Sequence, residues 1–144
     1  MLKEKIVYTD FNGQEQTEVA YFHLTKLEAT KLLAKYGNDI DAYVKKLVVE
    51  QNMVAMIDMI EDIILSSYGI KSDDGKTFIR NEEIRQQFSN SIPYAELVES
   101  VLSDTDKAVK FTKGLGIIES NNIMDQAKLK EHERMNVSQM PMQP

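Results

Sequence analysis

Cysteine is absent from the 144-residue sequence, and its absence excludes several kinds of chemistry. Without a thiol the chain can form neither a disulfide framework nor a thiolate metal site, and it has no cysteine nucleophile. Such a chain is typical of a reducing compartment such as the cytosol. Positive charge is also scarce: 17 lysines and arginines against 23 aspartates and glutamates leave a net charge of −6. A general nucleic-acid binder needs a basic surface, so nucleic acid is not an expected partner.

Long hydrophobic runs are missing as well. No apolar stretch approaches the ~20 residues that a membrane-spanning helix requires, and the acidic, tyrosine-containing start is unlike a signal peptide. We therefore expect a protein of the cytoplasm without a membrane partner. At 144 residues the chain can bury a sizeable core, and one domain is the most economical interpretation.

Catalytic and metal-binding motifs are also lacking. The sequence contains no Gly-rich phosphate loop, no nucleophile elbow and no HExxH motif. Its two histidines, His23 and His132, lie in separate segments, whereas a metal site needs several converging ligands. Glu82 and Glu83 point to different sides of a helix and are better explained as acidic residues of its first turn. We expect no enzymatic activity, no metal and no cofactor.

The N-terminal segment predicts a β-hairpin. Within residues 5–24, two stretches of alternating apolar and polar residues flank Asn12-Gly13, which is typical of a two-residue turn. Both faces of the second stretch carry apolar side chains. We expect one face to pack on helices and the other, with Val19 and Tyr21, to be covered by a partner.

Amphipathic segments after the hairpin predict about six helices. The first begins at Thr25, where Glu28 three residues on completes a capping box. Gly69 follows the longest segment and suits the left-handed residue that ends a helix. Ser103 is expected to cap the last helix. The predicted fold class is α+β, helix-dominant: an N-terminal β-hairpin packed on a bundle of about six short helices.

Asp73-Asp74-Gly75 predicts a tight turn, because Asp tolerates turn geometry and Gly reaches positive φ without steric cost. A calcium loop with Gly75 at its sixth position is the alternative. Asn81 would then replace the bidentate Glu, and Asp74 would be the one carboxylate among four ligand positions. We favour the plain turn.

The methionines of the longest segment raise the question of an adaptable apolar surface. The apolar stripe of this segment consists of Met53, Met56, Ile57, Ile60, Ile63 and Ile64. On this spacing we interpret Met53 and Met56 as core residues, and Met59, which is off the stripe, as the exposed one.

A string of spaced residues connects the sequence to a known family. The matching positions are Tyr8 to Gly13, Phe22 to Lys26, Ser67, Tyr68, Gly69, Lys71, Ser72, Asp73, Asp74, Gly75, Phe78, Ile79, Phe88, Ser91, Tyr94, Leu97, Asp104, Ala108, Phe111 and Gly114. In this order they resemble the tail assembly chaperones of long-tailed phages and prophages of low-GC Gram-positive bacteria. The resemblance covers residues 5–118.

The resemblance implies a non-enzymatic protein that keeps the tape measure protein soluble while tail tube subunits assemble around it. Such a protein is absent from the finished particle, and in many phages a ribosomal frameshift makes a longer form. Apolar grooves between helices would cover the partner's apolar stripes. The tail tube protein is a second candidate partner, and a homo-oligomer is a further expectation. The candidate partner-binding residues are Val19, Tyr21, Met59, Ile117 and Ile118.

Two other functions remain open at this point. The hairpin, with two partly apolar faces, could pair edge to edge in a ring, as in a structural subunit of the tail or connector. An acidic chain could also inhibit a host factor by mimicking nucleic acid, although the lysines interspersed here argue against it.

The apolar pattern ends after Ile118. We therefore assign residues 1–118 to one α+β domain and residues 119–144 to a polar tail that is partly helical and then flexible. This tail lies outside the resemblance.

Overall fold

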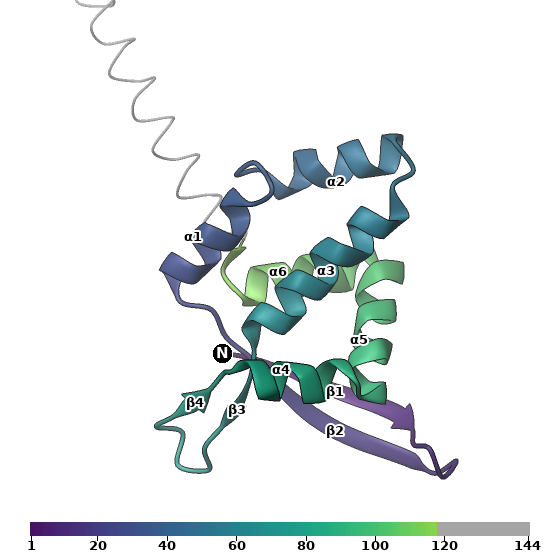
Figure 1. The fold of residues 1–144 in the computed structure, drawn as a ribbon, viewed down its shortest axis with the longest axis vertical. Coiled ribbons are helices and arrows are strands. Elements are labelled where there is room, and N and C mark those ends of the chain that lie inside the picture. The colour runs from purple at the N-terminus through teal and green to yellow at the C-terminus, as the bar shows by residue number, and fades with distance from the viewer. Residues whose placement is uncertain (118–144) are drawn as a thin grey trace, which may run out of the picture.

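The computed structural model describes residues 1–117, and these contain four strands and six helices (Figure 1). The strands are β1 (Leu2–Thr9), β2 (Glu15–Phe22), β3 (Tyr68–Lys71) and β4 (Phe78–Ile79). The helices are α1 (Lys26–Ala34), α2 (Ile40–Val49), α3 (Met53–Ser67), α4 (Glu82–Ser89), α5 (Ile92–Ser103) and α6 (Thr105–Gly114). The predicted helix-dominant α+β class is confirmed. A second hairpin, β3–β4, extends the predicted one into a four-stranded antiparallel sheet in the order β1-β2-β3-β4.

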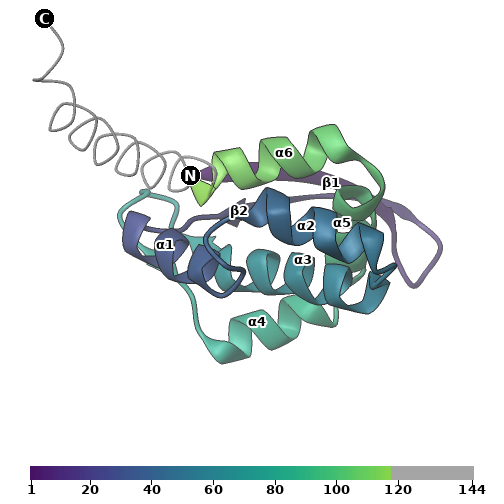
Figure 2. The ribbon, with the colours of Figure 1, turned by 90° about the horizontal axis from the view of Figure 1, so that it is seen from above.

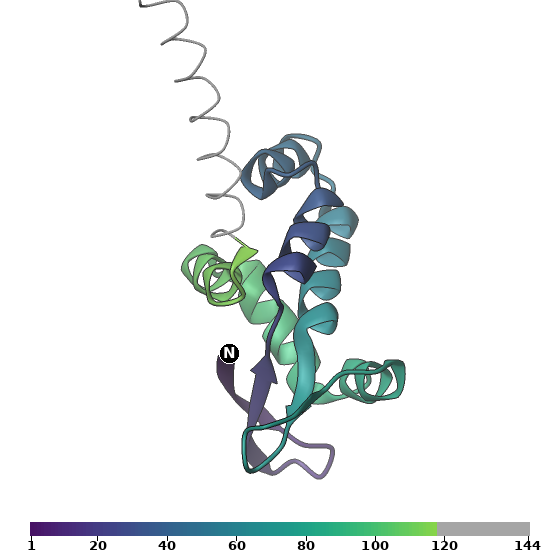
Figure 3. The same cartoon turned by 90° about the vertical axis from the view of Figure 1, so that its left-hand side faces the viewer.

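Some helices pack next to the sheet, and the others extend the molecule beyond it (Figures 1 and 3). Figures 1 and 3 show α2 at the end of the molecule farthest from the strands, with α3 running from it to β3. Figure 2 shows α2 and α3 between α6 on one side and α4 on the other. The helix α3 is therefore central, which explains why its sequence is the most apolar.

The loop of the first hairpin is longer than predicted. The last paired residues are Thr9 and Glu15, so a five-residue loop replaces the predicted two-residue turn at Asn12-Gly13. The Asp10 carboxylate accepts hydrogen bonds from the backbone N–H groups of Asn12 and Gln14, both at 2.9 Å. Gly13 has a φ of +79°, as a turn glycine should. The side chain of Asp10 organises the wider loop, and the turn signal alone did not reveal this.

One face of the hairpin enters the core and the other remains open. Ile6, Ala20 and Phe22 face the helices and are at most 5% exposed. On the opposite face Val19 is 41% exposed. Tyr21 is half-buried there, with the Lys71 Nζ 5.3 Å from its ring centroid. The expectation of two faces in different environments holds, while a partner on the outer face stays a prediction.

The helix caps follow the sequence signals at most positions. The Glu28 N–H donates to Thr25 Oγ1 at 3.1 Å, and the Thr25 N–H donates to Glu28 Oε1 at 2.9 Å, so the predicted capping box is confirmed. The prediction that Ser103 caps α6 is wrong. Its hydroxyl donates to the Glu99 carbonyl at 2.7 Å inside α5, and Asp104 accepts the N–H groups at the start of α6 instead. Aspartate is a favoured N-cap residue, because its carboxylate can accept these N–H groups.

The prediction that Gly69 ends α3 in a left-handed conformation is wrong. Gly69 lies in β3 opposite Tyr21. The helix passes directly into the strand through Tyr68, whose backbone is extended. A Cβ at Gly69 would come within 2.6 Å of the Phe78 ring and 2.7 Å of Arg80 Cγ. Glycine is required here by this close approach across the β3–β4 hairpin and not by its φ angle.

The turn at Asp74-Gly75 is confirmed. The Gly75 N–H donates to the Ser72 carbonyl at 3.0 Å, and Gly75 has a φ of +75°. The Asp74 carboxylate accepts from the Ser72 hydroxyl at 2.7 Å and from the Lys76 N–H at 3.0 Å. These bonds, the Ser72 bond foremost, lower the pKa of Asp74. The carboxylate is thus engaged within a plain turn.

Aromatic rings join the distant parts of the core. Phe22 is fully buried and contacts Phe111, Tyr68 and Phe88 at centroid distances of 5.2, 5.7 and 6.1 Å. These rings come from β2, α6, β3 and α4. Ile117, expected to be a partner-binding residue, is fully buried next to this core. Ile118 and the predicted tail, residues 119–144, lie outside the described residues.

Candidate functional site: an apolar groove between helices

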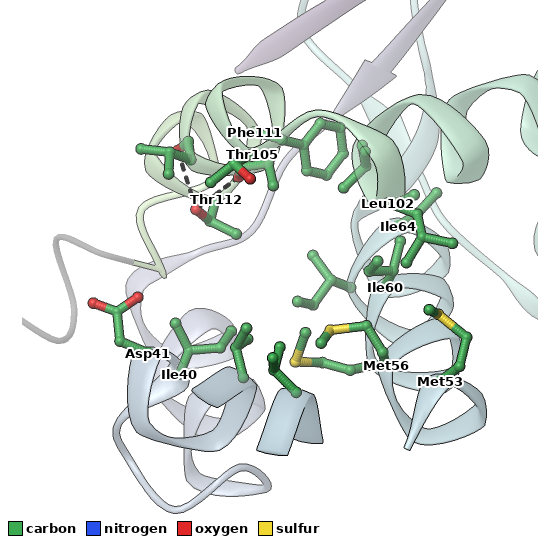
Figure 4. A pocket seen from close by; sticks show the side chains of 17 residues that line it. Ile40, Asp41, Met53, Met56, Ile60, Ile64, Leu102, Thr105, Phe111 and Thr112 are labelled. Carbon is green, nitrogen blue, oxygen red and sulfur yellow. Dashed lines mark hydrogen bonds between the residues drawn. The ribbon is translucent and has the colours of Figure 1, made fainter. Parts of the chain in front are cut away.

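The C-terminal half of α2 presents more apolar surface than it buries. Leu47 is 4% exposed, whereas Val48 is 62% and Val49 is 83% exposed. The residues Ile40, Val44 and Val48 repeat every four positions and so lie along one side of the helix. This side faces α6 across an open space rather than closing against it (Figure 4).

An apolar groove of about 390 Å³ occupies this space. Seventeen residues line it, and Figure 4 shows their side chains converging from α2, α3, α6 and the end of α5. They are Ile40, Asp41, Val44, Val48, Met53, Met56, Met59, Ile60, Ile63, Ile64, Val101, Leu102, Thr105, Ala108, Val109, Phe111 and Thr112. Asp41 is the one charged residue of this lining. The Thr112 hydroxyl donates to carbonyls of its own helix, those of Ala108 and Val109, both at 3.0 Å.

The groove has a closed floor and an open rim. Ile64 and Phe111, at 1% exposure each, form part of the floor and belong to the main core. Val48, Met53 and Val109 are all about half exposed or more and stand at the rim. A segment placed in the groove would therefore meet a preformed apolar surface, and its burial would release water from these rim residues.

The methionine predictions are reversed by this arrangement. Met59, expected to be exposed, is 5% exposed and lies in the lining, whereas Met53, interpreted as core, is 58% exposed. Met56 is partly buried, at the edge of the core. The reason is that α3 has helices on more than one side, so Met59 is buried together with Ile63 one turn further on. Met53 opens the helix at the end of the molecule, where less of the fold surrounds it.

Two tyrosines with raised pKa values connect α3 to neighbouring segments. The Tyr36 hydroxyl donates to Asp62 at 2.6 Å and joins the turn after α1 to α3. The Tyr94 hydroxyl donates to Glu61 and joins α5 to α3. Burial, and then the bond to the carboxylate, raises the pKa of each tyrosine. These bonds hold α3 in place beside the groove.

Two other kinds of site are missing from residues 1–117. No group of three or more histidine, aspartate or glutamate side chains there could hold a metal ion. None of the helices in the same range is both long and apolar enough to cross a membrane.

The structure separates the residues that the sequence proposed for partner binding. Met59 lies in the groove, Val19 and Tyr21 lie on the open face of the sheet, and Ile117 is buried. Val48 and Val109 were missed. The signal that could have found Val48 is the adjacent pair Val48-Val49 near the end of an amphipathic helix, where one apolar stripe cannot bury both residues.

Comparison with known families decides the assignment. A family model described as "Phage tail assembly chaperone" matches residues 1–141. The chain belongs to this family. No curated protein and no solved structure matches the chain. The match confirms the resemblance and corrects its extent, because this chaperone family includes most of residues 119–144, which the resemblance had left out.

Membership in this family implies that the chaperone acts on proteins of the phage tail. It also implies an assembly factor that works in the host cell rather than a component of the virion.

Proposed function

We propose that this tail assembly chaperone binds the tape measure protein during tail morphogenesis and holds it without catalysis, in the host cytoplasm. The groove between α2, α3 and α6 is the proposed binding site. Its large apolar surface, open at the rim and closed at the floor, is the observation that supports this proposal. The tail tube protein is a second proposed client, and a prophage or phage of a Gram-positive host is the proposed source.

The proposed client segment is an amphipathic helix. A helix enters such a groove through apolar side chains at positions i, i+3, i+4 and i+7. Each large apolar side chain that becomes fully buried contributes about 1.5–3 kcal/mol. Three or four such anchors would supply roughly 5–12 kcal/mol, which acts against the entropy lost on association. The same contacts would cover client stripes that otherwise drive self-association.

The acidic character of the chain would help to keep the complex of chaperone and client in solution. A net charge of −6 provides like-charge repulsion between complexes. A complex of a chaperone and an apolar client stays dispersed more readily when its net charge is far from zero.

Co-expression with the tape measure protein of the same phage tests the proposal. We expect the client to be soluble with the wild-type chain and largely insoluble with Val48→Asp, which places a charge at the groove rim. Val49→Asp is the matched control, because Val49 lies next in the same helix, is 83% exposed and is not part of the groove. Mass spectrometry of purified particles should find no copies of the chain.

Two results would count against the proposal in different ways. If the tape measure protein is equally soluble with and without the chain, the client is wrong. If the chain solubilises it and Val48→Asp does so equally well, the client is right and the groove is not its binding site.

A further inference from the structure

The described chain ends beside the groove. The helix α6 forms one wall of the groove, and Thr112 is its last lining residue. Five residues later Ile117 is fully buried, which anchors the chain to the core at this point. Figures 1 and 2 show the end of α6 and the start of α2 on the same side of the molecule, and Asp41 is the second residue of α2. The described chain therefore ends near the α6 wall of the groove.

The continuation carries side chains that complement the groove. Ile123, Ala127 and Lys130 are spaced i, i+4 and i+7, so in a helix they would share one face, with Met124 beside it. Two large apolar residues followed by a lysine match a lining that is apolar except for Asp41. We propose that this segment, residues 118–130, occupies the groove of the free chaperone and leaves it when a client binds.

The length of the connection permits this contact. An extended chain spans about 3.5 Å per residue, so the five steps from Ile118 to Ile123 cover up to about 18 Å. The ten residues of α2, at about 1.5 Å per residue, are about 15 Å long. The connection is thus as long as the α2 wall of the groove.

Tethering explains how a short segment can occupy the groove and still be displaced by a client. A segment on a short linker has an effective concentration in the millimolar range, so even weak contacts keep it bound. A client with a longer apolar stripe has more anchors and displaces it. Until then the segment would shield Val48, Met53 and Val109 and limit self-association of the chaperone. A second copy of the chain would cover the same residues, and the test separates the two occupants.

The absence of native cysteine allows a direct test with the full-length chain. The variant Val109→Cys/Ile123→Cys places one thiol at the rim and one in the proposed segment. Val19→Cys/Ile123→Cys is the matched control, because Val19 is similarly exposed but lies on the sheet. Under mild oxidation we expect the first pair to form an intramolecular disulfide at least about tenfold faster than the second, because the occupied groove raises the effective concentration of the thiols.

Several outcomes would overturn the inference. Equal rates for the two pairs mean that the segment does not prefer the groove. A disulfide that forms between chains, at a rate rising with protein concentration, means that a second copy is the occupant. Ile123→Asp/Met124→Asp should increase the binding of a hydrophobic dye to the chain, and an unchanged signal also contradicts the inference.

Occupation of the groove concerns the free chain alone, whereas displacement by a client rests on the proposed function. Added tape measure protein should slow formation of the Val109–Ile123 disulfide pair if both proposals are right. If the disulfide forms quickly and the client leaves its rate unchanged, the segment occupies the groove while the client binds elsewhere.

Discussion

At the scale of single residues, Glu28 joins a helix cap to the sheet. Its carboxylate accepts the Thr25 N–H at 2.9 Å and pairs with the Arg80 guanidinium at 2.9 and 3.0 Å. Arg80 in turn donates to the His23 carbonyl at 3.1 Å. Burial acts to raise the pKa of Glu28, but the hydrogen bonds from Thr25 and Arg80 outweigh it and lower the pKa below its ordinary value.

This lowered pKa predicts how stability depends on pH. Because the fold favours the charged form, the contribution of Glu28 is full above its unfolded pKa of about 4.3 and is lost as the pH falls through the folded value. Glu28→Gln keeps a hydrogen-bonding side chain in the capping box but loses the charge. We expect a cost of about 0.5–1 kcal/mol at pH 7, measured by urea denaturation, because the pair is partly exposed.

The difference between wild type and Glu28→Gln should shrink as the pH falls below about 4.3. Glu96→Gln, at an exposed position of α5, is the control and should cost little at any pH. A difference that is constant from pH 3 to pH 8 would show that Glu28 acts through packing and not through its charge.

At the scale of elements, the β3–β4 hairpin depends on the close approach at Gly69. Phe78 packs over Gly69 and meets the ring of His23 edge to face, at a centroid distance of 6.2 Å. Arg80, which pairs with Glu28, is the first residue after this hairpin. A side chain at position 69 would therefore disturb both the hairpin and its connection to α1.

Gly69→Ala should destabilise the protein by about 1–3 kcal/mol, because the new Cβ overlaps the Phe78 ring. Chemical denaturation of Gly69→Ala, Phe78→Ala and the double variant forms a double-mutant cycle. We expect the double variant to lose less stability than the sum of the two single variants, since removing the ring makes room for the methyl group. Additive losses would mean that Gly69 matters for another reason.

At the scale of the whole molecule, the Phe22 cluster brings together strands and helices from both ends of the described chain. Its members are separated by up to 89 positions in sequence, between Phe22 and Phe111. A core that connects such distant segments is expected to form or be lost as a unit. This supports our proposal that residues 1–118 form one domain.

Phe22→Ala should lower the free energy of unfolding by about 3–5 kcal/mol, because it leaves a large cavity among tightly packed rings. Val49→Ala, at a residue 83% exposed, should change it by no more than about 0.5 kcal/mol. Far-UV circular dichroism and the near-UV tyrosine signal should follow one coincident thermal transition in the wild type. Two separate transitions would instead divide the described chain into independent units.

The groove is also a property of the whole molecule, and the sequence could reveal only part of it. The apolar stripes that form its walls were visible as amphipathic segments. Whether two such stripes close against each other or stay apart depends on where the connections and the sheet hold the helices. The pair Val48-Val49 could show that one of the two residues is exposed, but the spacing of Val109 could not distinguish this rim residue from a core residue.

What the sequence alone determined are the features that depend on near neighbours. The capping box of Thr25 and Glu28 and the turn at Asp74-Gly75 involve atoms within a few residues of each other, so their signals were sufficient. The fold class followed from the same local periodicities. The family, too, was visible in a string of spaced residues.

Only the tertiary structure decided which of two similar residues is buried. Met59 and Met53 lie on the same helix, yet the helices packed around the centre of α3 cover the first and leave the second open. The role of Gly69 likewise depends on Phe78, which the β3–β4 turn brings against it. These outcomes depend on contacts between segments far apart in sequence, and local periodicity carries no information about such contacts.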